Sequence, residues 1–262
     1  MISSPWKKKL RYQSKYSEME KTLILLDKLN KVGFYSLEDF HSNIEKIIFP
    51  NIKVTFEGEG HTKSPGEDFF CPVQVHDTHL QTIENITDLP QQADASITFS
   101  SHTPLAVRTA DCLPLVFFDE DEKSPIMGVH AGWKGFAKNI IGHCTEKYFS
   151  HLKNNNRVRV IIGPAISRGS FEVGPEVIDA VSNSNILEQE ELYSCIQKGL
   201  QDRWHIDLQQ AACLQLISLG IAPENISVIR ECTFLKDRWH SFRRESKLCG
   251  HNFTVIEKLN PN

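Results

Sequence analysis

Cys112 and His130 lie on either side of an acidic segment, 119–125, that ends in proline. The apolar runs flanking this segment predict two strands joined by a turn. If the strands form an antiparallel hairpin centred near residue 121, Cys112 faces His130, with Cβ atoms about 4.5–5.5 Å apart. A thiolate and an imidazole at that separation can bind one metal ion or act as a Cys–His pair. A buried core cysteine is the simpler alternative, because free cysteines are often buried.

A second candidate segment, HAGWKG at 130–135, passes from a predicted strand into a predicted helix. Its two glycines allow close backbone approach, and a helix N-terminus offers free N–H groups. These features suit a phosphate or a ribose oxygen, with Lys134 as a nearby cation. An ordinary strand-to-helix turn, with Trp133 in the core, is the alternative.

Three further segments carry polar groups suited to ligand binding. The histidines of QVHDTH (74–79) are three positions apart, so at most one of them would share a site with Cys112. GPAISRGSFEVG (163–174) follows an apolar strand and is a plausible loop over a ligand, with Arg168 as its cation. In SFRRE (241–245), the adjacent Arg243 and Arg244 could clamp an anion, although such pairs are more often solvated or salt-bridged at the surface.

Hydrophobic periodicity indicates the elements that would position these groups. Strands are predicted over 53–56, 73–75, 96–99, 105–107, 115–118, 126–130 and 158–162. An amphipathic helix is predicted over 133–149, and another from about Asp207 to a stop at Gly220. Strands mixed with helices and joined by short turns favour an α/β or α+β sandwich over a simple doubly wound sheet.

The first 50 residues differ from the rest. Apolar residues at helical spacing predict a helix over 18–31. Ser36 followed by Asp39 resembles the capping box of a second helix, whose apolar face continues to Ile47. We therefore expect an N-terminal helical extension, 1–50, packed on a single catalytic domain, 51–262.

The composition excludes several classes of protein. The 262 residues include 29 Lys plus Arg and 33 Asp plus Glu, a net charge of −4, so a strongly basic nucleic-acid coat is excluded. With 40% hydrophobic and 24% charged residues, the chain is not disordered. Seven scattered cysteines without a CxxC pair do not indicate a disulfide framework. With no signal peptide at the start and no membrane span, since Arg108 and Asp111 interrupt the most apolar stretch, we expect a cytoplasmic location and no nucleic-acid partner.

Taken together, the segments resemble one family, the YfiH-type laccase-domain proteins, also called multicopper polyphenol oxidase-like proteins. TADCLP and HAGWKG are the most specific of them. The matching segments, in the order of the family, are QVHDTH (74–79), ADASIT (93–98), PLAVRTADCLPL (104–115), GVHAGWKG (128–135), IIGPAISRGSFEVG (161–174), IDLQQAACLQLISLGI (206–221), ECT (231–233) and SFRRE (241–245). The resemblance covers about three quarters of the chain, from about residue 70 to the C-terminus.

The resemblance implies a fold, a metal site and an activity. The fold is a compact α/β mixed-sheet sandwich with flanking helices, similar to the catalytic domain of cytotoxic necrotizing factors. The metal is usually zinc, and the matching ligands here are His76, Cys112 and His130. The family's purine nucleoside phosphorylases cleave adenosine, inosine, guanosine and methylthioadenosine with phosphate, and deaminate adenosine to inosine. An older assignment is copper-dependent oxidation of phenols.

The two reactions make different demands on the residues around the metal. Deamination needs an activated water and a carboxylate that moves protons, and Asp111 is nearest to a ligand in the sequence. Phosphorolysis needs groups that hold an anion below the ribose, for which Lys134, Arg168, Arg243 and Arg244 are the candidates. We expect a monomer that binds a purine nucleoside and phosphate.

Two other enzyme classes and a binding module are the competing hypotheses. A multicopper oxidase needs many histidine ligands, whereas the expected site has three ligands, one of them a thiolate. A metal-free hydrolase or amidase would use Cys112 as its nucleophile and His130 as its base. The segment 163–174 departs from the family pattern, because the two cysteines and the tyrosine of that pattern are replaced here around Arg168 to Phe171. A binding module whose altered pocket has lost activity is therefore the third alternative.

Overall fold

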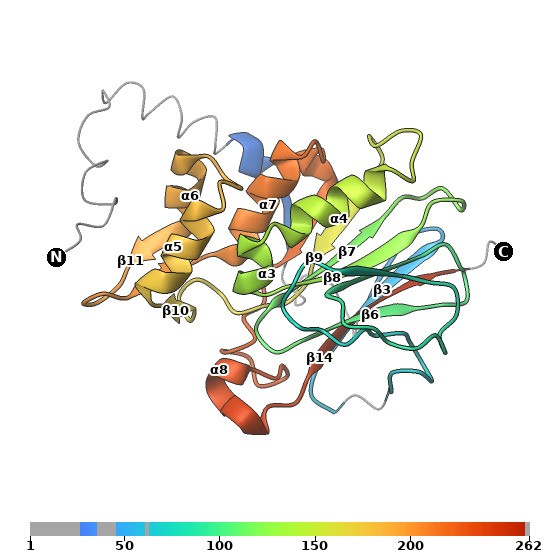
Figure 1. The fold of residues 1–262 in the computed structure, drawn as a ribbon, viewed down its shortest axis with the longest axis horizontal. Helices are drawn as coiled ribbons and strands as arrows, with labels where there is room; N and C mark the ends of the chain where they lie inside the picture. Colours follow the sequence, from blue (N-terminus) through green and yellow to red (C-terminus); the bar gives the residue numbers. More distant parts are fainter. Residues whose placement is uncertain (1–26, 36–45, 61–62, 260–262) are drawn as a thin grey trace.

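A seven-stranded mixed sheet forms the centre of the structure, a computed structural model that describes residues 27–35, 46–60 and 63–259 (Figure 1). Parallel pairs occur at both edges, whereas the central pairs are antiparallel. In spatial order its strands are β1 (Gly33–Tyr35), β13 (Ile226–Ile229), β9 (Arg159–Ile162), β7 (Leu113–Phe118), β8 (Ile126–Ala131), β5 (Ala95–Thr98) and β4 (Leu80–Ile83).

A second, antiparallel sheet covers one face of the first. In spatial order its strands are β2 (Lys46–Ile48), β3 (Ile52–Glu57), β14 (Asn252–Lys258) and β6 (Leu105–Thr109). Phe56 and Ile256 of this sheet share a buried cluster with Val116 and Phe118 of β7. The two sheets therefore form a sandwich with a common apolar core.

Helices cover the opposite face of the seven-stranded sheet (Figure 1). Leu115 and Phe117 of β7 belong to the cluster on this side, which also contains Ile141 and Leu214 from two helices. The sequence of β7 is an unbroken apolar run because both of its faces are buried. The helices are α3 (Trp133–Ala137), α4 (Ile140–Phe149), α5 (Pro175–Asn183), α6 (Gln189–Cys195) and α7 (Leu208–Ser218).

Short elements complete the described part of the chain. They are the three-stranded sheet of β10 (Glu172–Val173), β12 (Trp204–Ile206) and β11 (Ile196–Lys198), the helix α8 (Phe242–Glu245), and the 3₁₀ turns η2 (Pro223–Asn225) and η3 (Ser246–Leu248). The predicted α/β mixed-sheet sandwich with flanking helices is thus confirmed. The helix from Asp207 is also confirmed, and Gly220 lies just beyond its end with φ +96°, a conformation that favours glycine.

The predicted hairpin exists, but its register differs from the prediction. Pro114, not Cys112, lies opposite His130, and Leu113 lies opposite Ala131. The turn is therefore centred on Glu122, one residue later than predicted, which shifts every facing pair by two positions. Cys112 now belongs to the loop just before β7. Because a shift of two preserves the face on which side chains lie, it still lies close to His130.

Two other predicted elements were wrong in part. The helix predicted over 133–149 is split into α3 and α4 by Asn139, which has φ +69°. The helix N-terminus expected to bind an anion thus belongs to the five-residue α3. No strand forms over 73–75, where the backbone N–H of Val75 is bound by a side chain instead of a neighbouring strand.

Residues 1–26 and 36–45 of the predicted N-terminal extension lie outside the described residues. The described end of the helix predicted over 18–31, residues 27–30, is helical. Ile47 was predicted to be helical, but it lies in β2 and pairs with Val54 of β3. The proposed boundary at residue 51 stays a prediction. Among the helices of the described residues, none has the length and apolar character needed to cross a membrane.

Candidate metal centre and its cavity

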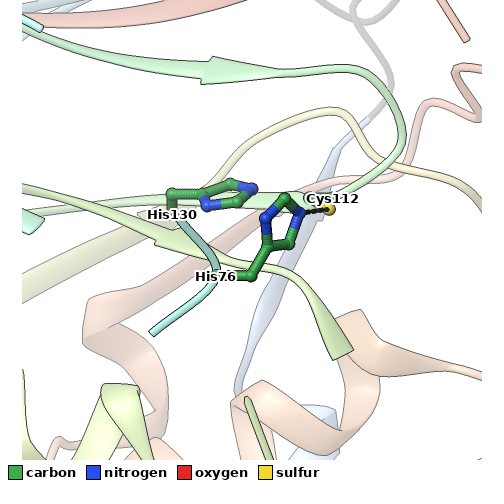
Figure 2. A group of neighbouring side chains, drawn as sticks. All are labelled: His76, Cys112 and His130. Atoms are coloured by element: carbon green, nitrogen blue, oxygen red, sulfur yellow. Dashed lines mark hydrogen bonds between the residues drawn. The ribbon is translucent and has the colours of Figure 1, made fainter. Parts of the chain in front are cut away.

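His76, Cys112 and His130 converge on one point (Figure 2). One potential ligand atom from each residue lies within 4.8 Å of the others. The Cys112 sulfur lies 3.8 Å from Nε2 of His76, and the two imidazole rings meet edge to face with centroids 4.8 Å apart. Among the residues that the structure describes, this is the one cluster of three side chains able to ligate a metal. The three residues singled out from the sequence are therefore brought together.

The loop between β6 and β7 places Cys112. The preceding residue, Asp111, has φ +89°, which turns the chain sharply at the mouth of the hairpin. Its carboxylate accepts hydrogen bonds from Oγ1 of Thr233 and from the backbone N–H of Arg243, both at 2.7 Å. Its carbonyl accepts from the N–H of Ile166 at 3.0 Å. Asp111 thus joins three chain segments beside the thiol.

His130 comes from the buried strand β8 and is 4% exposed. Its Nδ1 lies 2.7 Å from Oδ1 of Asp94, a carboxylate with no exposed surface. An ionised carboxylate only accepts hydrogen bonds, so Nδ1 is the donor and carries the hydrogen. Nε2 is therefore the nitrogen of His130 that is free to bind a metal ion.

His76 lies in the loop that precedes β4 and has φ +61°. Gln74 fixes the base of this loop, because its side chain both donates to the carbonyl of Arg108 at 2.6 Å and accepts from the N–H of Arg108 at 2.8 Å. His79, the second histidine of the segment, is exposed and lies 4.0 Å from Asp77. Only His76 joins the cluster, in agreement with the expectation that at most one histidine of the segment would do so.

The surroundings of the cluster favour charge on the sulfur. Burial raises the pKa of the Cys112 thiol, but hydrogen bonds to His130 and His76 and their positive charge outweigh it and lower the pKa to about 6. Burial likewise opposes the charged form of His130, but Asp94 and Cys112 raise its pKa to about 9. A thiolate is the form in which cysteine binds a metal, so little free energy is needed to prepare this ligand.

The residues present fit a zinc ion. Two imidazole nitrogens and a thiolate are typical zinc ligands, and three protein ligands leave a fourth tetrahedral position open. Gly132 adds a steric argument, since a Cβ at this position would lie 2.8 Å from Cδ2 of His76 and 2.9 Å from the Cys112 sulfur. The backbone at 132 therefore approaches the cluster more closely than any other residue type allows.

The cluster lies in the wall of a cavity of about 580 Å³, within the range of small-molecule sites. Lys134, Arg243 and Asp111 line it, as expected of site residues. Aromatic side chains also line it, including Phe242, which is 60% exposed. The other lining residues are Gln74, Val75, His76, Arg108, Thr109, Ala110, Cys112, His130, Trp133, Ile166, Phe171, Leu208 and His251.

Two of the predicted anion-binding residues are not among the described residues that line this cavity. The guanidinium of Arg244 donates to the carbonyls of Thr233, Phe234 and Trp239 and pairs with Glu245. These contacts give Arg244 a role in holding the segment 233–245 together. Arg168 lies in the loop that follows Ile166, where its carbonyl is 3.1 Å from Nδ1 of His205.

Sequence reasoning did not single out Asp94 or the aromatic residues Phe171 and Phe242. Asp94 had a signal, since a carboxylate between two alanines at the start of a buried strand is unusual. Phe171 and Phe242 had none, because an isolated phenylalanine that lines a cavity does not differ in sequence from one in the core. Their neighbour Arg243 donates to the carbonyls of Ser170 and Glu172, which links both phenylalanines to one wall of the cavity.

The fold and the cluster define a mixed α/β sandwich with a candidate His₂Cys metal centre beside a small-molecule cavity. Residues 56–258 match the family model described as multi-copper polyphenol oxidoreductase laccase, and the chain belongs to this family, the YfiH-type laccase-domain proteins.

Two relatives carry the names of enzymes that act on nucleosides. A Bacteroides thetaiotaomicron protein named purine nucleoside phosphorylase is 31% identical over 199 residues, which cover 71% of each chain. A protein from an unknown prokaryotic organism, named adenosine deaminase RL5, is 27% identical over 201 residues, or 72% of this chain and 75% of its own.

Solved structures share the fold. The hypothetical protein YfiH of Bacillus licheniformis has a TM-score of 0.68 and 25% identity, with 76% of each chain covered. YlmD of Geobacillus stearothermophilus has a TM-score of 0.69 and 23% identity over 80% of this chain and 92% of its own. The second likeness bears on the fold alone.

Proposed function

We propose that this chain is a zinc-dependent purine nucleoside phosphorylase, with adenosine deaminase and methylthioadenosine phosphorylase as side activities. The observation that carries the proposal is the convergence of His76, Cys112 and His130 in the wall of a cavity of about 580 Å³. The names of the relatives, purine nucleoside phosphorylase and adenosine deaminase, support the same class of substrate.

His76, Cys112 and His130 would hold the ion through two nitrogens and the sulfur. Zinc bound by these residues supplies a Lewis acid with one position open to substrate or water. Cys112 and His130 need little reorganisation to hold the ion. The thiol pKa of Cys112 is already lowered to about 6, and the Nδ1 hydrogen of His130 is already bound by Asp94. The site is thus prepared before the substrate enters.

In phosphorolysis, a phosphate oxygen bonds to the anomeric carbon while the bond from that carbon to the base breaks. The electron pair of the broken bond leaves with the base, and positive charge develops on the sugar. Lys134 and Arg243 line the cavity and supply positive charge for the phosphate. Phe171 and Phe242 offer apolar faces on which a purine can stack.

For deamination, Asp111 was the candidate proton carrier. Both of its carboxylate oxygens already accept hydrogen bonds, one from Thr233 and one from the N–H of Arg243. These contacts support a role in positioning the loop of Cys112 and the start of α8 instead of proton transfer.

Two other functions rest on particular observations. The family description favours copper-dependent oxidation of phenols, but a set of three ligands suits a single ion and not a multicopper centre. The chain of contacts from Cys112 through His130 to Asp94 has the order of a cysteine hydrolase triad, which would work without a metal.

Metal analysis combined with a nucleoside assay tests the proposal. Purified protein should contain about one zinc per chain and release adenine from adenosine when phosphate is present, with inosine as a second product. His76→Ala should lose both metal and activity, whereas His79→Ala, three residues away and outside the cluster, should keep both. Phenol oxidation that depends on added copper, or a metal-free protein inactivated by alkylation of Cys112, would replace the proposal with one of its alternatives.

A further inference from the structure

Asp94 contacts two of the three ligand residues and yet is not a ligand. It lies just before β5 and is 1% exposed. Its Oδ1 accepts hydrogen bonds from the N–H of His76 at 2.8 Å and from Nδ1 of His130 at 2.7 Å. Its Oδ2 accepts from the N–H of Val75 at 3.1 Å and of Asp77 at 2.7 Å. One carboxylate thus receives four hydrogen bonds, three from the loop that carries His76 and one from the ring of His130.

We propose that Asp94 is the positioning residue of the metal centre, which orients His76 and His130 for the ion before the ion binds. The inference rests on the proposed metal centre. It does not depend on which reaction the centre performs.

The contact with His130 sets which ring nitrogen faces the cluster. Because the carboxylate only accepts, the hydrogen of a neutral His130 stays on Nδ1 and the lone pair stays on Nε2. A carboxylate behind a ligand histidine also fixes the ring plane, as in carboxylate–histidine–zinc arrangements. The Cys112 sulfur and a ring nitrogen of His130 lie within 4.8 Å of each other, and Nε2 is the nitrogen that Asp94 leaves free.

The contacts with the backbone set the position of His76. Three successive N–H groups, those of Val75, His76 and Asp77, point at one carboxylate. This arrangement holds His76 at φ +61°, a region that residues other than glycine seldom adopt. Without the carboxylate, these three N–H groups lose their acceptor, so we expect the loop to leave this conformation and the imidazole of His76 to move away from Cys112.

Asp94→Asn removes one acceptor oxygen without changing the size of the side chain. If the amide oxygen faces Val75 and Asp77, the NH₂ group faces Nδ1 of His130 and forces the hydrogen onto Nε2, where it blocks the ligand position. If the oxygen faces His130, the NH₂ group meets two N–H donors of the loop. In the first orientation the NH₂ group also meets the N–H of His76, so either orientation disturbs at least one ligand residue.

The matched control is Asp119→Asn. Asp119 is also buried, at 3% exposed, and its Oδ1 accepts from the N–H of Asp121 and pairs with Arg157. It lies in the turn of the same hairpin that carries His130, at the opposite end of β8. Loss of stability alone would therefore affect both variants, whereas an effect on the metal should appear only in Asp94→Asn.

The experiment measures metal binding directly, by zinc competition with a chelator and by the absorption spectrum of the cobalt-substituted protein. We expect zinc affinity to fall about 10- to 100-fold in Asp94→Asn, with an altered cobalt spectrum, and to change less than about 2-fold in Asp119→Asn. Equal affinity and an unchanged spectrum in Asp94→Asn would overturn the inference. If Asp94→Asn does not fold, ¹⁵N-histidine spectra of the zinc-loaded wild-type protein decide, since a hydrogen on Nε2 of His130 contradicts the inference and one on Nδ1 supports it.

The outcomes also separate this inference from the proposed function. Wild-type protein that binds zinc but leaves nucleosides intact contradicts the function and not the role of Asp94. Active wild-type protein whose zinc affinity survives Asp94→Asn contradicts only the role of Asp94. Wild-type protein that binds no metal contradicts both.

Discussion

The carboxylate of Asp111 accepts a hydrogen bond at 2.7 Å from the backbone N–H of Arg243, which lies 132 positions later in the sequence. Its other oxygen accepts from Oγ1 of Thr233 at the same distance. The loop that carries Cys112 is therefore joined to the start of α8, which carries Phe242. A candidate metal ligand and an aromatic wall of the cavity are held in one arrangement by a single carboxylate.

Asparagine at position 111 can keep both contacts, since its oxygen can accept from Arg243 and its NH₂ group can donate to the hydroxyl of Thr233. It also tolerates the φ of +89° at this position. We expect Asp111→Asn to retain deaminase and phosphorylase kcat within about 3-fold, and Asp111→Ala to raise the KM for nucleosides about 10-fold. Steady-state kinetics of both variants check this. A loss of 100-fold or more in deamination by Asp111→Asn, the size typical of a missing acid–base group, would restore Asp111 as a proton carrier.

The hairpin and its two chemical residues could be predicted because periodicity and turn composition are local properties. The apolar runs of β7 and β8, separated by an acidic turn, were sufficient to bring Cys112 and His130 together. The register was off by two because the sequence does not fix the centre of a seven-residue turn. His76 came from the family resemblance alone, since no local pattern relates its loop to the hairpin.

The rest of the site depends on conformations and contacts that no periodicity expresses. His76, Asp111 and Asn139 all have positive φ, and each turns the chain where a regular element or an ordinary loop was expected. Arg244 resembles an anion-binding residue in sequence, but it is used by the carbonyls of the chain around it. Such roles depend on hydrogen bonds between groups that are distant in the sequence and meet only when the chain folds.

Gly132→Ala tests the close approach of the backbone to the metal centre. The new methyl group would lie under 3.0 Å from the side chains of His76 and Cys112, which can yield in the metal-free protein but not when both hold an ion. We therefore expect zinc affinity to fall at least 10-fold with little loss of thermal stability in the metal-free state. Gly169→Ala is the control, because a Cβ there would have no atom within 4 Å. Equal zinc affinity in both variants would contradict the steric argument.

The pH dependence of thiol alkylation tests the charge state of Cys112. Its pKa is lowered from 9.0 to about 6, so the reactive thiolate forms as the pH rises through 6. In chelator-treated protein, the alkylation rate at Cys112, measured by mass spectrometry, should be half-maximal near pH 6 and level off above about pH 7.5. His130→Ala removes the hydrogen bond and the positive charge, so the midpoint should move upward. A wild-type rate that still rises between pH 8 and pH 9 would show an ordinary thiol.

Substitutions of Asn139 test how much the break between α3 and α4 contributes to stability. Its φ of +69° suits asparagine or glycine, and its Oδ1 accepts from Nε2 of the buried Gln215 at 2.6 Å. Asn139→Ala loses the contact and adds backbone strain, so we expect the free energy of unfolding to fall by about 2–3 kcal/mol. Asn139→Gly loses only the contact and should be the more stable of the two variants. Denaturant unfolding of both variants measures the difference, and equal stabilities would mean that the backbone conformation carries no cost.

Substitutions of Phe242 test whether the purine base stacks on its ring. It is 60% exposed although it is a large apolar residue, which is explained if a ligand covers it. A ring contact of this kind contributes about 0.5–1.5 kcal/mol, so Phe242→Ala should raise the KM for nucleosides about 3- to 10-fold while kcat and zinc content stay close to wild type. Phe242→Tyr, which keeps the ring, should restore the KM, and Leu200→Ala, an exposed apolar residue outside the cavity lining, should have no effect. If Phe242→Ala lowers kcat at unchanged KM, the ring contacts the transition state and not the bound base, and the aromatic wall has another function.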